Sequence, residues 1–68
     1  MSAATTVVPV QPLAVPPVKA AELLGISDRA LRRWRAEGRG PRYVTLGGNK
    51  VVYRVSDLES WLESEASK

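Results

Sequence analysis

The sequence predicts a small, mainly helical domain with one β-hairpin, in the order helix, helix, hairpin, helix. Residues 16–38 contain two short stretches with helical spacing of apolar residues, separated by a turn at Gly25. Residues 42–54 change to β-branched and aromatic residues around Gly47 and Gly48, and residues 56–62 return to helical spacing. We therefore expect one domain over residues 16–65.

Composition excludes several classes of function. The 68 residues include no cysteine and no histidine, which removes disulfides, zinc spacings and the commonest general base. Asp57 and Glu59 point in different directions within one helical turn, so they do not form a catalytic pair. The sequence therefore predicts a protein that is not an enzyme and that has no catalytic residues, cofactor or metal.

The chain also lacks the signals of export and membrane insertion. Its first basic residue is Lys19, and no apolar run approaches the ~18 residues that a membrane span needs. The absence of cysteine fits an intracellular protein. We expect a soluble, cytoplasmic protein with no membrane partner.

Residues 1–15 differ from the rest of the chain. They are uncharged, contain two prolines and show neither helical nor alternating periodicity. This composition predicts a flexible or extended N-terminal tail. Two alternatives stay open for the apolar residues of this tail: they lie on the surface of the domain, or they contact a neighbouring molecule. These residues are Val7, Val8, Val10 and Leu13.

The first predicted helix begins at Pro16-Pro17 and ends before Gly25. Proline is tolerated in the first helical turn because its missing N–H would have no intrahelical partner there. Glycine commonly ends a helix because it adopts the left-handed conformation readily. The small side chains of Ala20 and Ala21 would allow a second helix to approach closely.

The second predicted helix begins after Ser27, a good N-cap, and closes at Gly38. Asp28 places negative charge at the positive end of the helix dipole. Ala30, Leu31 and Trp34 share one side of this helix. The other side carries Arg29, Arg32, Arg33 and Ala36, with Arg35 at the border.

The predicted hairpin pairs residues 42–46 with residues 51–54 through the turn at residues 47–50. An isolated hairpin is marginal in water, so we expect Val44, Leu46 and Val52 to pack on the helices. Asn49 and Lys50 would then lie at the tip.

The third predicted helix begins at Asp57, because Ser56 and Glu59 form a capping box. Its predicted buried stripe is Leu58, Trp61 and Leu62. Both tryptophans of the chain lie at core spacing beside leucines, so we interpret them as packing residues rather than as platforms for bases. Acidic residues at the far end of this helix make it a brace, away from phosphates.

Basic residues gather in one part of the chain. The net charge is +3, but residues 29–54 contain eight basic residues and one acid, Glu37, while the remainder is net negative. Segregation of this kind indicates a footprint for a polyanion. The alternative is a plain helical hairpin whose arginines form a solvated face, and the excess of four arginines over two acids on one short helix argues against it.

The spacing around the turn is more specific. Relative to Gly25, a small residue (Ala21) lies four positions before, and apolar Ile26, Leu31 and Trp34 lie one, six and nine positions after. This spacing matches a helix-turn-helix. With the segments at residues 31–38, 40–44 and 53–62, the chain resembles the winged helix-turn-helix domain shared by phage excisionases and mercury-resistance-type regulators over residues 16–64.

The resemblance implies that the second helix enters the major groove of double-stranded DNA and that the wing contacts the backbone or the adjacent minor groove. It places Arg29, Arg32 and Arg33 in the groove and Asn49 and Lys50 on the wing tip. It also implies an integrase and neighbouring copies of the protein as partners, in the cytoplasm of a bacterial or phage-infected cell.

Two features depart from the family pattern. Pro16-Pro17 stands where the family usually has a Thr or Ser cap followed by acidic residues. The sequence ends seven residues beyond Trp61, which leaves no room for the long dimerisation helix of the mercury-resistance regulators. We therefore expect the excisionases to be the better match.

Arginine can bond two acceptors of guanine at once, whereas its contacts to phosphate carry no sequence information. We expect base contacts from Arg29 and Arg33, and phosphate or mixed contacts from Arg32 and Arg35. The residues expected on phosphates are Arg42, Lys50 and Arg54. An ion pair with Asp57 or Glu59 remains an equal alternative for Arg54, and Arg39 is expected to be exposed.

The leading hypothesis is an excisionase-like recombination directionality factor, which binds and bends attachment-site DNA cooperatively and promotes integrase-mediated excision. The first alternative is a small winged helix-turn-helix transcriptional regulator. The second is a protein-interaction module whose basic face binds an acidic protein.

Overall fold

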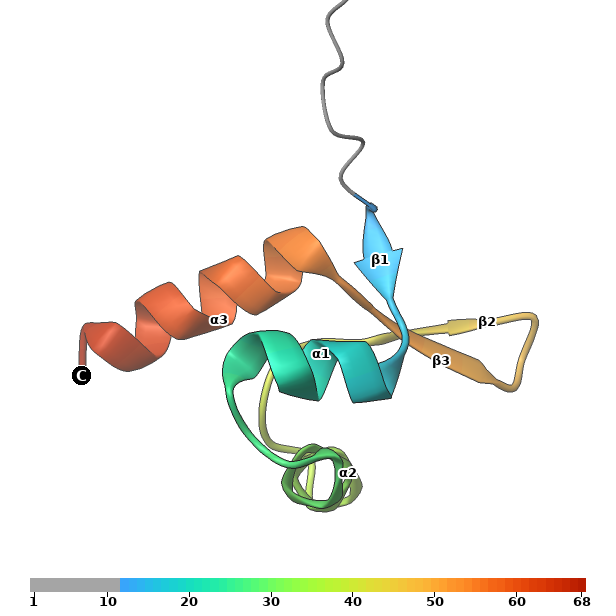
Figure 1. Ribbon diagram of the computed structural model, residues 1–68, viewed down its shortest axis with the longest axis horizontal. Helices are drawn as coiled ribbons and strands as arrows, with labels where there is room; N and C mark the ends of the chain where they lie inside the picture. The colour runs from blue at the N-terminus through green and yellow to red at the C-terminus, as the bar shows by residue number, and fades with distance from the viewer. Residues whose placement is uncertain (1–11) are drawn as a thin grey trace, which may run out of the picture.

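The computed structural model describes residues 12–68, which form three helices and three short strands. In chain order these are β1 (Ala14–Val15), α1 (Pro17–Leu24), α2 (Asp28–Ala36), β2 (Val44–Leu46), β3 (Lys50–Arg54) and α3 (Val55–Ala66). In Figure 1, α1 lies between α2 and α3, and the hairpin of β2 and β3 extends to one side. The predicted mainly helical fold with a small hairpin is confirmed.

The turn between α1 and α2 has the predicted form. Gly25 adopts a left-handed conformation with φ of 78°, and its N–H donates to the carbonyls of Ala21 and Glu22. Ser27 caps α2 by accepting a hydrogen bond from the Ala30 N–H at 3.0 Å. Ala20 is 0% exposed and Ala21 is 1% exposed, because α2 packs closely on this side of α1.

Side chains from all three helices and from β1 and β3 build the core, and Tyr53 and Leu31 are the largest that are fully buried. The buried cluster consists of Val15, Ala20, Ala21, Leu31, Tyr53 and Leu58. Trp34 packs against this cluster, and its ring lies 5.5 Å from that of Trp61 between centroids. Both tryptophans therefore serve packing, as the sequence predicted.

The sheet has one strand more than predicted. Its order is β1-β3-β2, with both pairs antiparallel. Val15 pairs with Tyr53 and is only 5% exposed. The prediction of a tail through residue 15 is therefore wrong for Ala14 and Val15, and residues 1–11, with Val7, Val8 and Val10, lie outside the described residues.

The hairpin also turns a different face to the core. Of the residues expected against the helices, Val52 is buried at 8% exposure, whereas Leu46 is 48% exposed. Val51 and Tyr53, on the opposite strand face, pack on the buried cluster. Side chains alternate between the two faces of a strand, so one choice of face decides them all. Burial of the Tyr53 ring removes more apolar surface from water than burial of the opposite face, which carries Val44 and Val52, would remove. Val52 is buried outside this cluster.

The capping box predicted for α3 is absent. The helix begins at Val55, its N-cap is Arg54, and no side chain caps it. Strand β3 runs directly into α3 because the Val55 N–H bonds to the Leu13 carbonyl at 2.9 Å and continues the ladder. In the buried stripe, Leu58 is 3% exposed as expected, whereas the exposure of Leu62 at 44% contradicts the prediction.

We expect Gly40→Ala to destabilise the protein more than Gly25→Ala. Both glycines have positive φ, which costs an L-residue about 1–2 kcal/mol. A Cβ at position 40 would also lie 3.3 Å from Cε3 and 3.4 Å from Cβ of Trp34, whereas at position 25 it meets nothing within 4 Å. Overpacking adds roughly 1–3 kcal/mol. Urea unfolding of both variants measures the difference, and equal losses would contradict the tight contact at Trp34.

Candidate nucleic-acid interface

Three arginines of α2 share one exposed face. Arg29, Arg32 and Arg33 line a shallow hollow of about 430 Å³ together with Ala36. A small residue at position 36 leaves the base of this hollow open. The structure thus brings together the three residues that the sequence placed on the outer face of the second helix.

The three arginines differ in their partners. Nη2 of Arg32 lies 2.8 Å from Oδ2 of Asp28, one helical turn earlier. Exposed pairs of this kind stabilise a helix by only about 0.3–0.5 kcal/mol, so Arg32 can exchange Asp28 for another anion at little cost. Within residues 12–68, Arg29 and Arg33 form neither an ion pair nor a side-chain hydrogen bond.

Arg35 does not line the hollow formed by the other arginines of α2. Its Nη1 donates to the Tyr53 hydroxyl at 3.4 Å, and its guanidinium carbon lies 5.8 Å from the centre of the Tyr43 ring. The two tyrosine rings are 6.0 Å apart. Arg35 therefore connects α2 to the hairpin.

Sequence reasoning missed both tyrosines as partners of this helix. The signal was present in the border position of Arg35 and in the alternation that puts Tyr53 on the same strand face as Val51. The prediction that the face of Val52 packs on the helices hid this signal.

A second basic hollow, of about 320 Å³, lies at the loop that follows α2. Arg35, Arg39 and Arg42 line it, with the backbone of residues 38–41 and the Tyr43 ring between them. Arg39 is exposed, as expected, and its Nη1 lies 3.0 Å from Oε1 of Glu37. Arg42 is exposed and, in the part of the chain that the structure describes, forms no ion pair.

The hairpin presents its basic residues at two separate ends. Asn49 and Lys50 are exposed beside the turn, at the tip that points away from the helices in Figure 1. Arg54 lies at the other end of β3, about 13 Å along the strand. There its guanidinium donates to both carboxylate oxygens of Asp57, at 3.0 and 3.2 Å. The structure contains the ion pair that was the alternative for Arg54.

Ion pairing divides the charges of the protein into two groups. Five of the seven carboxylates pair with a cation of the chain. One of them, Glu22, has its pKa lowered by the Lys19 ammonium 2.8 Å away. Among residues 12–68, four cations remain without a carboxylate or tyrosine partner, namely Arg29, Arg33, Arg42 and Lys50.

These unpaired cations suit a nucleic acid better than a small molecule. Arg29, Arg33 and Arg42 line shallow hollows on α2 and the loop after it rather than an enclosed cavity. Lys50 is exposed at the hairpin. Guanidinium and ammonium groups bind phosphates, and guanidinium groups also bind base edges. A nine-residue helix such as α2 is about 13 Å long and fits a major groove.

Two other features, a metal site and a membrane-spanning helix, are considered for the described residues. Residues 12–68 contain no group of three side chains able to hold a metal ion. No helix in the same range is long and apolar enough to cross a bilayer.

Comparison with known proteins adds one finding. A family model described as a helix-turn-helix domain matches residues 18–66. No curated protein and no solved structure gives a match to this chain. The matched range includes α2, the loop hollow and the hairpin, so every unpaired cation described above lies inside it.

The contacts of the arginines predict different effects on stability. Arg35→Ala should lower the free energy of unfolding by about 1 kcal/mol, because it removes a hydrogen bond and a guanidinium–aromatic contact. Arg29→Ala should change it by less than about 0.5 kcal/mol, as is usual for an exposed side chain without partners. Urea unfolding checks both values. Equal stability of the two variants would show that Arg35 does not support the hairpin.

Proposed function

Since the chain belongs to the helix-turn-helix domain family, we propose that this sequence-specific DNA-binding protein is an excisionase-like recombination directionality factor without enzymatic activity. Its α2 lies in the major groove of double-stranded DNA, and its hairpin contacts the backbone or the adjacent minor groove. Copies bind side by side on attachment-site DNA, bend it and favour excision by an integrase.

The position of the unpaired cations is the observation that supports the proposed DNA interface. Arg29 and Arg33 lie on the exposed face of α2, Arg42 lies in the following loop and Lys50 lies at the hairpin. Carboxylates of the chain itself pair with Lys19 and Lys68, outside this surface, and with Arg54 at the end of β3 away from the hairpin tip. The positive charge that remains for a polyanion is therefore concentrated on α2, the loop and the hairpin.

Different contacts are assigned to these groups. We assign base edges to Arg29 and Arg33, because they project from the exposed face of α2 and have no ion-pair partner to release. Arg32 gives phosphate or mixed contacts after release from Asp28. Phosphate contacts come from Arg42 and Lys50, and Asn49 lies beside Lys50 at the tip. Arg35 and Arg54 act mainly through Tyr53 and Asp57.

The short recognition helix supports binding by several copies. Helix α2 spans nine residues and offers two arginines without partners, enough to contact only a few base pairs. Specificity for one genomic site needs more contacts than this. Adjacent protomers would provide them, which is the arrangement that the resemblance to excisionases implies.

Arg33→Ala should lower the discrimination between specific and random DNA by about 1–3 kcal/mol, because a bidentate contact to a base is lost. Lys50→Ala should weaken binding to both DNAs about equally, since a phosphate contact carries no sequence information. Fluorescence anisotropy at several salt concentrations measures both affinities.

The salt series also tests the interaction with DNA itself. Lys50→Ala should reduce the slope of log affinity against log salt by about one. Equal loss of discrimination from both substitutions would refute the assignment of roles. Affinity for duplex DNA that does not depend on salt would favour the alternative of a module that binds acidic proteins.

A footprint and bending assay on the DNA flanking the gene tests the excisionase assignment. We expect several adjacent sites in the same direction and strong bending, because side-by-side binding repeats one contact pattern along the duplex. A single isolated promoter site, or a palindrome without bending, would contradict this and favour a small transcriptional regulator.

A further inference from the structure

The outward face of α3 carries the two carboxylates that the protein does not pair internally. Glu59 and Glu63 have no ion-pair partner within residues 12–68, whereas Glu65, on the same helix, lies 2.8 Å from Lys68. The two residues are four positions apart and therefore lie on the same side of the helix. By helical spacing, Trp61 lies on the opposite side of α3 from these two residues.

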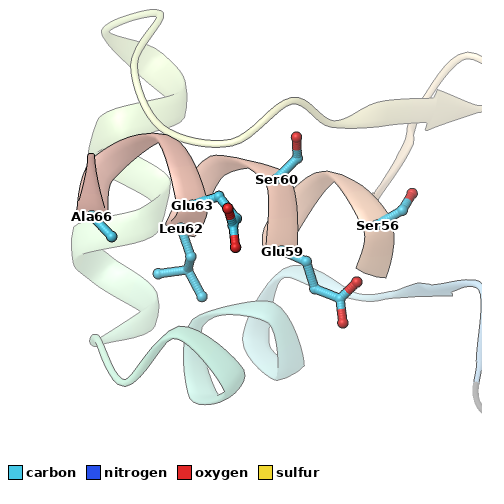
Figure 2. Close-up of a pocket in the computed structure, with 6 residues that line it drawn as sticks. All are labelled: Ser56, Glu59, Ser60, Leu62, Glu63 and Ala66. Carbon is cyan, nitrogen blue, oxygen red and sulfur yellow. The ribbon is translucent and has the colours of Figure 1, made fainter. Parts of the chain in front are cut away.

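The same face is hollowed and partly apolar. Figure 2 shows Glu59, Leu62 and Glu63 along one open hollow of about 660 Å³, which Ser56, Ser60 and Ala66 complete. Leu62 is 44% exposed there, although its neighbour on the inward side, Leu58, is 3% exposed. Leu62 therefore adds apolar surface beside the two unpaired carboxylates on this face.

The geometry points to an occupant: we propose that this face of α3 binds a basic amphipathic helix of another protein. The hollow extends over eleven residues of α3, from Ser56 to Ala66, a rise of about 15 Å, which corresponds to roughly three turns of a docked helix. Apolar side chains of that helix cover Leu62, and its lysine or arginine side chains pair with Glu59 and Glu63.

Binding at this face is compatible with binding of DNA. Helix α3 lies on the other side of α1 from α2, which carries Arg29 and Arg33 (Figure 1), and Lys50 lies at the hairpin. Arg42, in the loop, lines a separate hollow with Ser60 and Trp61 of α3, and Glu59, Leu62 and Glu63 do not line that hollow. The two faces also carry opposite charge, so DNA and the basic helix do not compete for one surface. The protein would thus hold a second basic protein beside the DNA.

A titration of the full-length, ¹⁵N-labelled protein tests the proposal. The probe is a synthetic amphipathic helix with leucines on one face and lysines beside them, and the control peptide carries glutamates in place of the lysines. We expect the lysine peptide to shift amide resonances of α3 residues around Leu62, and the glutamate peptide to shift none. Shifts centred on α2 or the hairpin, or equal effects of both peptides, would overturn the proposal.

Variants separate this contact from general charge attraction. The double variant Glu59→Gln, Glu63→Gln should raise the Kd for the lysine peptide about tenfold, roughly the loss of two exposed ion pairs. The matched control Glu65→Gln, outside the hollow, should leave the Kd unchanged, and Leu62→Ser should weaken binding without altering the charge. Equal effects of the double variant and the control would overturn the proposal.

Two further measurements identify other outcomes. The double variant should keep the DNA affinity of the parent protein, so a failure of the DNA proposal and a failure of this one remain distinguishable. Concentration-dependent shifts of the same α3 resonances without peptide would show that a second copy of the chain occupies the face. That result would overturn the proposed partner.

Discussion

The close contact of α1 and α2 at Ala20 and Ala21 is the constraint on which the rest of the structure depends. These residues are 0% and 1% exposed, so no larger side chain fits between the helices without separating them. Gly25 turns the chain, and Leu31 then fills the space beside the alanines. This contact fixes the axis of α2 and, with it, the direction in which its arginines project.

The charges follow from the same arrangement. Acids close to a basic residue in sequence, such as Asp28 and Asp57, neutralise it locally. Arg33 keeps its full charge toward solvent, because Glu37, one helical turn later, pairs with Arg39 instead. A modest net charge therefore produces one face that is strongly basic and another that is acidic, in a chain of only 68 residues.

Most features that depend on local sequence were predictable, although the capping box expected at the start of α3 does not form. The start and end of α1 and α2, the hairpin and the shared face of Arg29, Arg32 and Arg33 all follow from caps, turns and periodicity. Contacts between distant segments were not, because they depend on which alternative buries more surface. Three features depend on such distant contacts. They are the pairing of Val15 with Tyr53, the strand face that packs on the core, and the contact of Arg35 with Tyr53.

Strand β1 has a consequence for the solubility of the domain. Residues 51–53, two valines and a tyrosine, form a short β-prone segment of the type that promotes aggregation when its edge is free. β1 occupies one edge of β3 and β2 the other, and Lys50 and Arg54 flank the segment as charged gatekeepers. Two residues ahead of the first helix thus protect the most aggregation-prone strand of the protein.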